Sequence, residues 1–478
     1  MVVFDDDDRS LEPVFNEKSM SMLGRDLLTT GRLNPEGRAS ALAILARFRC
    51  VLESLGVQRM RAVATAAARE ASDSAAFIAE ACAALGAPIE VISGEEEARL
   101  SACGVICGIP GADGVISDLG GGSLEVAEVR QGEVHGPVSL SLGPLGLGRI
   151  VDLRQEARLI DERLAAVPAG LARGRALYVV GGAWRALAKH YFERRHYPIR
   201  IIHEFELAAE DALKFVRLVG RTRENELSKL KGMSGRRREA APYSSRLLGC
   251  LIERLQPERI VFSAYGLREG VQYVQMSAGM RGLDPLLDHC RRLGQSGARA
   301  PFDGERLAEW ALAAFDAPPA DLRLVRAAAW LSDMSGNDHP DYRGHHAAAR
   351  ALHLASAAIS HRERVFLAAS VYARYHGFGM EGALGRAAEL VDEATRRRAT
   401  ALGMTFRLAH AIAPGGGLEP APGLRRGFSL RRTADRLSLI ADGVDPGILG
   451  ETARRRLAGL AQALAVDYAI VRIQSAAA

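Results

Sequence analysis

Residues 92–129 read ISGEEEARLSACGVICGIPGADGVISDLGGGSLEVAEV, and their glycines and carboxylates constrain both fold and chemistry. An apolar strand pattern at 115–118 runs into Gly120, Gly121 and Gly122, and a second strand pattern begins at Ser123. Walker loops and dinucleotide-binding turns lead from a strand into a helix, so this turn belongs to neither class. Glycines let backbone N–H groups approach an anion. The stretch predicts a phosphate cradle built as strand, turn and strand, with a simple glycine-rich hairpin turn as the alternative.

Carboxylates surround this loop. Asp118 ends the first strand, where it is placed to hold a divalent cation, and Glu125 shares the strand face of Ser123, two residues away. Glu95–Glu97 opens a predicted helix after a strand pattern at 89–93, and one of these side chains is expected to polarise a water. The alternatives are an exposed strand glutamate at 125 and acidic residues that only favour the positive end of a helix.

Two further elements are candidates for the same site. Arg69 follows a strand pattern at 61–64, and a guanidinium suits bidentate contact with phosphate. Gly181 and Gly182 follow a strand pattern at 177–180 and open a helix, which is a second place for an anion. An exposed helix arginine and close helix packing are the respective alternatives.

Strand and helix patterns alternate up to about residue 275, which predicts an α/β protein with mostly parallel sheets. A hairpin of strands 123–129 and 134–142, joined at Gln131-Gly132, interrupts this order. Other strands are predicted at 199–203 and 260–262. Helices are predicted at 35–55, with Asn34 as N-cap, and at 74–85, capped by Ser72 or Asp73.

The second half of the chain changes character. Residues 285–410 are rich in Ala, Leu and Arg with helical periodicity, which predicts an all-α domain with helix candidates at 325–331 and 347–360. A Pro/Gly-rich linker follows at 414–423. A strand pair near 427–440 and a helix at 451–464 complete the predicted elements.

Composition limits the class of protein. The chain has 478 residues, a net charge of +5, 48% hydrophobic and 25% charged residues, which excludes wholesale disorder and suggests about three domains. Six cysteines in such a length read as reduced thiols. The sequence has neither an apolar run of membrane-spanning length nor a signal peptide at its start, so a cytoplasmic protein without a membrane partner is expected.

The basic residues form short clusters. They are 236–238, 396–398, 425–426, 431–432 and 454–456. Solvated faces and loops are the simplest interpretation of any one cluster, but their recurrence favours a polyanionic partner. The small net charge does not favour nucleic acid.

Taken together, the motifs resemble the Ppx/GppA family of exopolyphosphatases and guanosine pentaphosphate phosphohydrolases. The segments that carry the resemblance are 63–72 (VATAAAREAS), 92–100 (ISGEEEARL), 116–125 (ISDLGGGSLE), 179–187 (VVGGAWRAL), 234–242 and 261–267 (VFSAYGL). The resemblance implies an actin-like, sugar-kinase-like (ribonuclease H-like) region of two lobes, followed by two smaller domains. The implied domains are lobe I at 1–100, lobe II at 101–278, an all-α HD-like domain at 279–412 and a small α/β domain at 424–478.

The resemblance also implies a reaction, the Mg²⁺-dependent hydrolysis of terminal phosphoanhydride bonds. Glu97 would position the attacking water, and Asp118 and Glu125 would be metal ligands. Phosphate would be bound by Arg69, Gly120, Gly121, Gly122 and Ser123, with Gly181 and Gly182 as a further anion site. An exopolyphosphatase acting on inorganic polyphosphate is the first expectation, and a homodimer is expected by family analogy. The alternatives are a guanosine pentaphosphate (pppGpp) phosphohydrolase, a non-catalytic polyphosphate-binding protein, and an actin-like ATPase or sugar kinase.

The sequence departs from the family pattern in several places. Family members begin with a strand and a phosphate loop of the form D-I-G-S-N-S, whereas this chain starts at the strand that follows. We therefore expect that loop to be missing, through a late start site or a real truncation. Ala183 stands where Thr is frequent, and Glu239 where Asp is usual. Ser332 replaces the His of the HD pair beside Asp333, so the helical domain is expected to bind or position the polyanion without that metal site.

Overall fold

The computed structural model describes residues 1–5, 9–19, 21–25, 27–145, 152–299, 303–315, 318–413 and 427–473. The chain forms two compact units, Met1–Gly282 and Leu283–Ala478. The finer division into four domains stays a prediction. Among the described helices, none combines the length and the apolar character needed to cross a bilayer.

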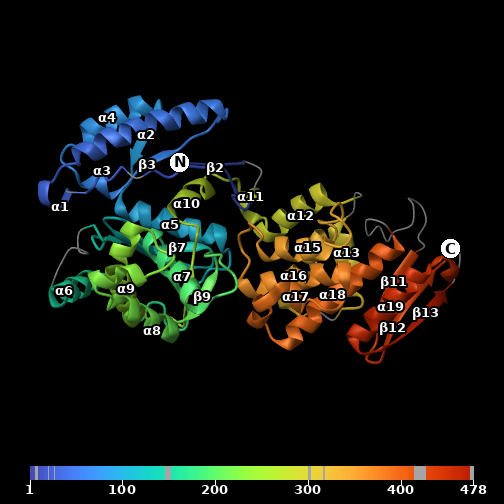
Figure 1. Ribbon diagram of the computed structural model, residues 1–478. Helices are drawn as coiled ribbons and strands as arrows, with labels where there is room; N and C mark the ends of the chain where they lie inside the picture. The colour runs from blue at the N-terminus through green and yellow to red at the C-terminus, as the bar shows by residue number, and fades with distance from the viewer. Residues whose placement is uncertain are drawn as a thin grey trace. The chain divides into compact units, whose positions relative to one another are not determined.

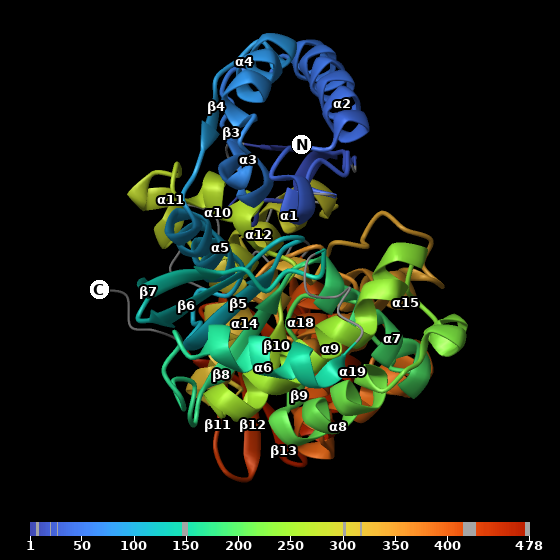
Figure 2. The ribbon, with the colours of Figure 1, turned by 90° about the vertical axis from the view of Figure 1, so that its left-hand side faces the viewer.

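The N-terminal part of the first unit combines short strands with two long helices. Its strands are β1 (Val2–Phe4), β2 (Pro13–Asn16), β3 (Ala62–Ala64) and β4 (Ile89–Val91). Its helices are α1 (Leu27–Thr30), α2 (Pro35–Ser54), α3 (Ala66–Glu70) and α4 (Ser74–Leu85). β1 pairs with β2 antiparallel, and β3 with β4 parallel. Helices α2 and α4 lie side by side (Figure 1 and Figure 2).

The helix starts in this part test the capping predictions. The side chain of Asn34 accepts a hydrogen bond from the Gly37 N–H at 2.9 Å, which confirms it as the N-cap of α2. Asp73 occupies the N-cap position of α4 but makes no side-chain cap bond. Its carboxylate instead accepts from the Leu33 N–H at 3.0 Å, so the prediction of a side-chain cap was wrong. The competing donor comes from a distant segment that local sequence does not reveal.

A six-stranded sheet forms the centre of the first unit. Its strands are β5 (Gly114–Leu119), β6 (Leu124–Arg130), β7 (Glu133–Leu140), β8 (Ala176–Val180), β9 (Phe205–Ala208) and β10 (Arg259–Phe262), in the order β7-β6-β5-β8-β10-β9. Within this sheet only the neighbouring pairs β5–β8 and β8–β10 are parallel. The sheet is therefore less parallel than predicted, because the hairpin β6–β7 and the edge strand β9 add antiparallel pairs.

Helices cover both faces of this sheet (Figure 1). The helices of this part of the chain are α5 (Gly94–Gly108), α6 (Leu153–Leu164), α7 (Gly182–Arg195), α8 (Ala209–Gly220), η2 (Glu224–Lys229), α9 (Gly235–Leu255), α10 (Leu267–Tyr273) and α11 (Ala278–Gly282). Alternate residues of a strand face opposite sides. Val115 and Leu177 accordingly join the apolar cluster with α7, α8 and α9, while Ile116 and Tyr178 join the one with α5.

Two local predictions in this region had different outcomes. The hairpin turn is confirmed, since Gln131 and Gly132 both have positive φ, as a tight two-residue hairpin requires. The predicted strand at 199–203 is wrong, because the chain there turns through His203 and Glu204 before β9 begins. Glu204 has a φ of 56°, which is incompatible with a continuous strand.

The second unit is helical up to residue 412, as predicted. Its helices are α12 (Pro285–Gly297), α13 (Gly304–Leu312), α14 (Pro319–Leu331), α15 (Arg343–Leu352), α16 (His361–His376), α17 (Glu381–Leu384), η3 (Gly385–Leu390) and α18 (Glu393–Ile412). The helix predicted at 347–360 ends at Leu352. The next helix, α16, has Ser360 as its N-cap, whose side chain accepts a hydrogen bond from the Glu363 N–H.

The C-terminal part of this unit is a small α/β layer. It comprises β11 (Gly427–Arg432), β12 (Arg436–Asp442), η5 (Pro446–Ile448), α19 (Glu451–Leu464) and β13 (Asp467–Ile473), with the strands in the order β11-β12-β13. The strand pair and the helix were predicted, whereas β13 was not. The predicted linker at 414–423 lies outside the described residues.

Candidate active site

The glycine loop joins two strands that place two carboxylates opposite each other. In the antiparallel pair β5–β6, Asp118 lies opposite Glu125. Residues directly opposite in such a pair point to the same face, with Cβ atoms about 5 Å apart. Ser123 closes the loop, since its carbonyl oxygen accepts from the Gly120 N–H at 3.0 Å. The sequence spacing therefore brings both predicted metal ligands to the base of the predicted phosphate loop.

The loop itself presents backbone donors. The carbonyl oxygens of Gly121 and Gly122 accept from Leu145 and Gly143 N–H groups, each at 3.0 Å. Their own N–H groups donate no hydrogen bond within the described part of the chain. Neither these two glycines nor Gly120 has a positive φ, so conformation alone does not require glycine here. Free amides without flanking side chains are what an oxyanion site needs, which favours the cradle over a simple hairpin turn.

The start of α5 selects one glutamate among three. Glu95 is exposed, and Glu96 forms two hydrogen bonds of 2.7 Å with Arg99. Glu97 is only 7% exposed, and its carboxylate accepts from Arg69 Nη1 at 3.2 Å and from the hydroxyl of Thr65. The helix-dipole interpretation thus suffices for Glu95 and Glu96, whereas Glu97 is turned into the protein beside a predicted phosphate-binding arginine.

Close contacts hold α3, the start of α5 and strand β7 together. Arg69 Nη1 also donates to the carbonyl oxygen of Ile92 at 3.0 Å, which ties α3 to the strand end before α5. A Cβ at Gly94, the first residue of α5, would lie 2.5 Å from the Cβ of Ser139 on β7. Only glycine lets α5 begin so near the hairpin, so this position brings Glu97 towards Glu125.

Three serine hydroxyls orient the strand carboxylates. Ser139 Oγ donates to Glu125 at 2.9 Å, and Ser123 also forms a side-chain hydrogen bond with Glu125. Ser101 Oγ, one helical turn after Glu97, donates to Asp118 at 2.8 Å. Ser101 and Ser139 were not singled out from sequence, because only the folded register places them against the carboxylates.

The three carboxylates repel one another electrostatically. Burial raises the pKa of Glu125 to about 8, and the negative charges of Glu97 and Asp118 add to that rise. Burial likewise raises the pKa of Glu97 and of Asp118, although Arg69 opposes it for Glu97 and Ser101 for Asp118. Such a cluster is unfavourable when fully ionised unless a cation or proton neutralises it, which is typical of functional sites.

The donor set fits a magnesium ion. Within the described ranges no three His, Cys, Asp or Glu side chains converge as a metal site. Mg²⁺ commonly binds through one or two carboxylates and keeps several waters, so the facing pair Asp118 and Glu125 is sufficient. The pKa values of both carboxyl groups are raised, and a divalent cation bound between them would stabilise their ionised form.

The Gly181-Gly182 turn has a structural reason as well. Gly181 has a φ of 113°, and a Cβ there would lie 2.4 Å from the carbonyl oxygen of Leu119. The packing alternative therefore accounts for Gly181. A Cβ at Gly182 would lie 3.7 Å from Arg237 Nη2, so this helix start faces a cation.

Four basic side chains near these elements were not predicted as site residues. They are Lys18, Arg185, Arg237 and Arg268. Burial and the charges of Arg268 and Arg237 lower the pKa of Arg185, and burial and the three arginines lower that of Lys18. Arg185 also interacts with Asp118. The sequence held a clue to each arginine. Arg185 lies one helical turn after Gly181, Arg237 belongs to the basic cluster 236–238, and Arg268 directly follows the VFSAYGL motif.

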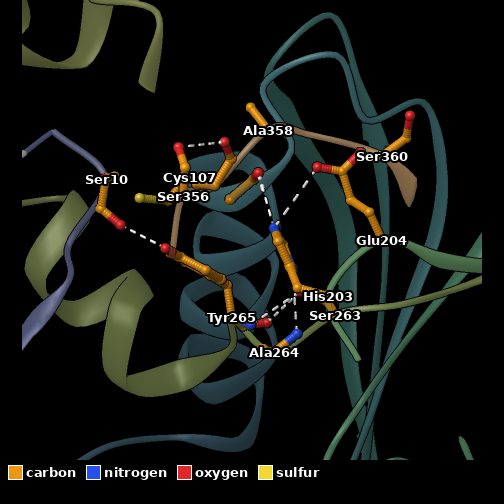
Figure 3. A network of polar contacts seen from close by, with 12 residues as sticks. Ser10, Cys107, His203, Glu204, Ser263, Ala264, Tyr265, Ser356, Ala358 and Ser360 are labelled. Atoms are coloured by element: carbon orange, nitrogen blue, oxygen red, sulfur yellow. Dashed lines mark hydrogen bonds and ion pairs between the residues drawn. The ribbon is translucent and has the colours of Figure 1, made fainter. Parts of the chain in front are cut away.

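The VFSAYGL motif forms a turn held by hydrogen bonds to Ser263 and His203 (Figure 3). The Tyr265 N–H donates to Ser263 Oγ at 3.0 Å, and the Ala264 N–H donates to His203 Nδ1 at 3.3 Å. These bonds fix the turn that leads to Gly266. A Cβ on Gly266 would lie 2.6 Å from Val180 and 3.5 Å from Asp118 Oδ2, so glycine is required for the turn to reach the metal-ligand candidate.

Comparison with known proteins finds relatives that are named exopolyphosphatases. The chain is 32% identical over 234 residues to Exopolyphosphatase 2 of Mycobacterium tuberculosis, an alignment covering 45% of this chain and 72% of that protein. The crystal structure of an exopolyphosphatase from Cytophaga hutchinsonii is 24% identical and superposes with a TM-score of 0.51 over 57% of this chain and 91% of that chain. This likeness confirms the predicted actin-like fold for the part of the chain that it covers.

Two family models match in succession. The model of the Ppx/GppA phosphatase family matches residues 2–278, and that of the exopolyphosphatase C-terminal region matches residues 289–466. The first alone spans more than half of the chain. The chain therefore belongs to the Ppx/GppA phosphatase family.

Proposed function

We propose that this chain is a Mg²⁺-dependent exopolyphosphatase, which hydrolyses the terminal phosphoanhydride bond of inorganic polyphosphate and releases orthophosphate. The observation that carries the proposal is that buried Glu97 interacts electrostatically with the facing pair Asp118 and Glu125, which flank a loop with free amides. Membership of a phosphatase family and the similarity to a protein named Exopolyphosphatase 2 support it.

The mechanism assigns each group one task. The N–H groups of Gly121 and Gly122 bind oxygens of the terminal phosphate and hold its phosphorus in line with a water. Glu97 accepts the proton of that water as the new P–O bond forms and the bridging P–O bond breaks. Its raised pKa makes it a better base than an ordinary glutamate. Asp118 and Glu125 would hold the Mg²⁺ ion, which when bound would neutralise phosphate charge.

Little acid catalysis is required because a phosphate chain is a good leaving group. The departing oxygen needs charge neutralisation, which nearby cations supply. Arg185 is placed to do so, since it interacts with Asp118, and Arg237 adds a second positive charge beside Arg185. Several mutually repelling cations favour a substrate with several phosphates over a simple phosphate monoester.

The test compares two substrates, one test variant and one control variant. Orthophosphate release is measured from long-chain polyphosphate and from pppGpp with Mg²⁺, for the chain, Asp118→Asn and the control Asp113→Asn. Asp113 is exposed and precedes the same strand, so its substitution should leave the rate unchanged. We expect polyphosphate to be the better substrate and Asp118→Asn to lower kcat/KM by about 100-fold or more.

Two other results would contradict the exopolyphosphatase proposal. Release from pppGpp alone would make the chain a nucleotide phosphohydrolase that uses the same site. No release from either substrate, with polyphosphate still bound, would make it a binding protein.

A further inference from the structure

The second unit contains a group of basic side chains that the proposed reaction does not use. We call Arg299, Arg374, Arg407, Arg455 and Arg456 the arginine cluster. Arg299 follows α12, Arg374 lies on α16, Arg407 on α18, and the last two on α19. Residues from four separate helical segments thus bring positive charge together within one compact unit.

One buried carboxylate serves two of these arginines. Asp333, only 1% exposed, accepts from Arg299 Nη2 at 2.9 Å and from Arg374 Nη2 at 3.1 Å. The Arg374 side chain is itself almost fully buried, and its guanidinium lies 4.6 Å from the centre of the Tyr375 ring. Its Nε has no hydrogen-bond partner within the described part of the chain. This inner pair of arginines therefore carries one positive charge more than its carboxylate offsets.

The outer arginines add charge without any acid. Among the residues that the structure describes, Arg407, Arg455 and Arg456 form no ion pair. Arg407 Nη1 donates to the carbonyl oxygen of Tyr375, and Arg456 Nη1 donates to that of Arg407 at 3.0 Å. These bonds fix two half-buried guanidiniums in place and leave most of their N–H donors for another group.

Electrostatics shows that the charges oppose one another. Burial lowers the pKa of Arg374 to about 10, and the charges of Arg299 and Arg456 contribute. Burial and the charges of Arg407, Arg455 and Arg299 lower the pKa of Arg456. Burial and the charges of Arg374, Arg299 and Arg456 lower the pKa of the neighbouring His410 well below its ordinary value, so a further positive charge is disfavoured there. Held together in this way, the cluster is unfavourable until an anion joins it.

We propose that the arginine cluster is a second anion site, which binds a phosphate group of an inorganic or organic phosphate. Guanidinium groups match the oxygens of phosphate with paired N–H donors. The outer arginines, with free donors, contact the ligand, and Asp333 holds the inner pair in position. This site lies in the unit that does not contain Glu97, Asp118 or Glu125, and it does not depend on the proposed hydrolysis.

Calorimetric titration of the full chain tests the proposal. The parent carries Glu97→Gln to prevent turnover, and the probe is tripolyphosphate without Mg²⁺, with orthophosphate as a second arm. The test variant adds Arg407→Gln and Arg456→Gln, and the matched control adds Arg306→Gln and Arg397→Gln, two arginines on the exposed surface of the same unit. The test variant and the control therefore each lose two positive charges relative to the parent.

We expect the test variant to lose one binding event that the parent and the control retain, or to bind there at least 10-fold more weakly. Binding of both probes at that site would define a general phosphate site, and binding of tripolyphosphate alone a site for phosphate chains. Equal stoichiometry and affinity in all three proteins would overturn the proposal, as would an effect reproduced by sodium chloride at equal ionic strength.

Thermal unfolding guards against a folding artefact. Removing two repelling charges should leave the phosphate-free unfolding midpoint of the test variant equal to or above that of the parent. Orthophosphate should raise the midpoint of the parent more than that of the variant. A midpoint that falls in the variant, with no response of the parent to phosphate, would show that the arginines serve only packing and would contradict the proposal.

Discussion

At the scale of single residues, the carboxylates and Arg69 could be singled out from the sequence, whereas three further arginines could not. Asp118 and Glu125 lie seven positions apart around one turn, so strand geometry alone places them face to face. The choice of Glu97 over Glu95 and Glu96 required the resemblance, because the pattern did not say which face of α5 turns inward. Arg185, Arg237 and Arg268 come from three distant segments, and only the fold brings them together.

Glu125 makes a prediction about pH. Its pKa is raised from 4.5 to about 8 in the folded chain, so folding favours the protonated side chain. The stability that this group contributes is complete below about pH 4.5 and is lost as pH rises towards 8. Without Mg²⁺, the unfolding midpoint of the chain should therefore fall more steeply between pH 5 and pH 8.5 than that of Glu125→Gln.

Thermal denaturation across that pH range measures the difference, with Glu133→Gln as control because Glu133 is exposed on the neighbouring strand. Added Mg²⁺ at pH 8 should raise the midpoint of the chain and of the control, and should have less effect on Glu125→Gln. Parallel curves for all three proteins would refute the raised pKa.

At the scale of elements, local signals succeeded where local geometry decides. The Gln131-Gly132 turn and the helix at 451–464 were found because turn and helix signals there agree with the tertiary structure. The strand predicted at 199–203 is absent. The prediction rested on an apolar run, and the sequence did not reveal the turn at Glu204. The helix expected at 347–360 ends early, because composition indicated a helix without showing its end.

Gly181 provides a test at this scale. We expect Gly181→Ala to destabilise the chain by about 2 kcal/mol or more, because its φ is unfavourable for alanine and the new Cβ would meet the Leu119 carbonyl. Gly174→Ala is the matched control, since Gly174 also has positive φ but no atom lies near its Cβ position. The control should cost about 1 kcal/mol. Thermal unfolding compares the two, and equal losses would show that the contact with β5 is unimportant.

At the scale of the whole molecule, the proposed reaction resides in one unit. The change to helical composition near residue 285 was visible in the sequence, and it lies next to the boundary between the two units. How many compact units the α/β region forms was not predictable, because that depends on contacts between distant segments. Each unit has apolar clusters of its own.

This organisation predicts that residues 1–282 fold alone and retain hydrolysis. The fragment contains Glu97, Asp118, Glu125 and the glycine loop, whereas residues 283–478 contain none of them. Circular dichroism and orthophosphate release from tripolyphosphate with Mg²⁺ should show a folded, active N-terminal fragment and an inactive C-terminal one. A folded but inactive N-terminal fragment would mean that the second unit completes the site.

The central claim is that Glu97 orients the attacking water. The most direct measurement is single-turnover release of orthophosphate from tripolyphosphate, with Mg²⁺ and enzyme in excess, for Glu97→Gln beside Glu95→Gln. Both remove one negative charge from the first turn of α5, but Glu95 is exposed and Glu97 buried. We expect a rate about 100- to 10,000-fold lower for Glu97→Gln and an unchanged rate for Glu95→Gln. Equal rates for the two variants would contradict it.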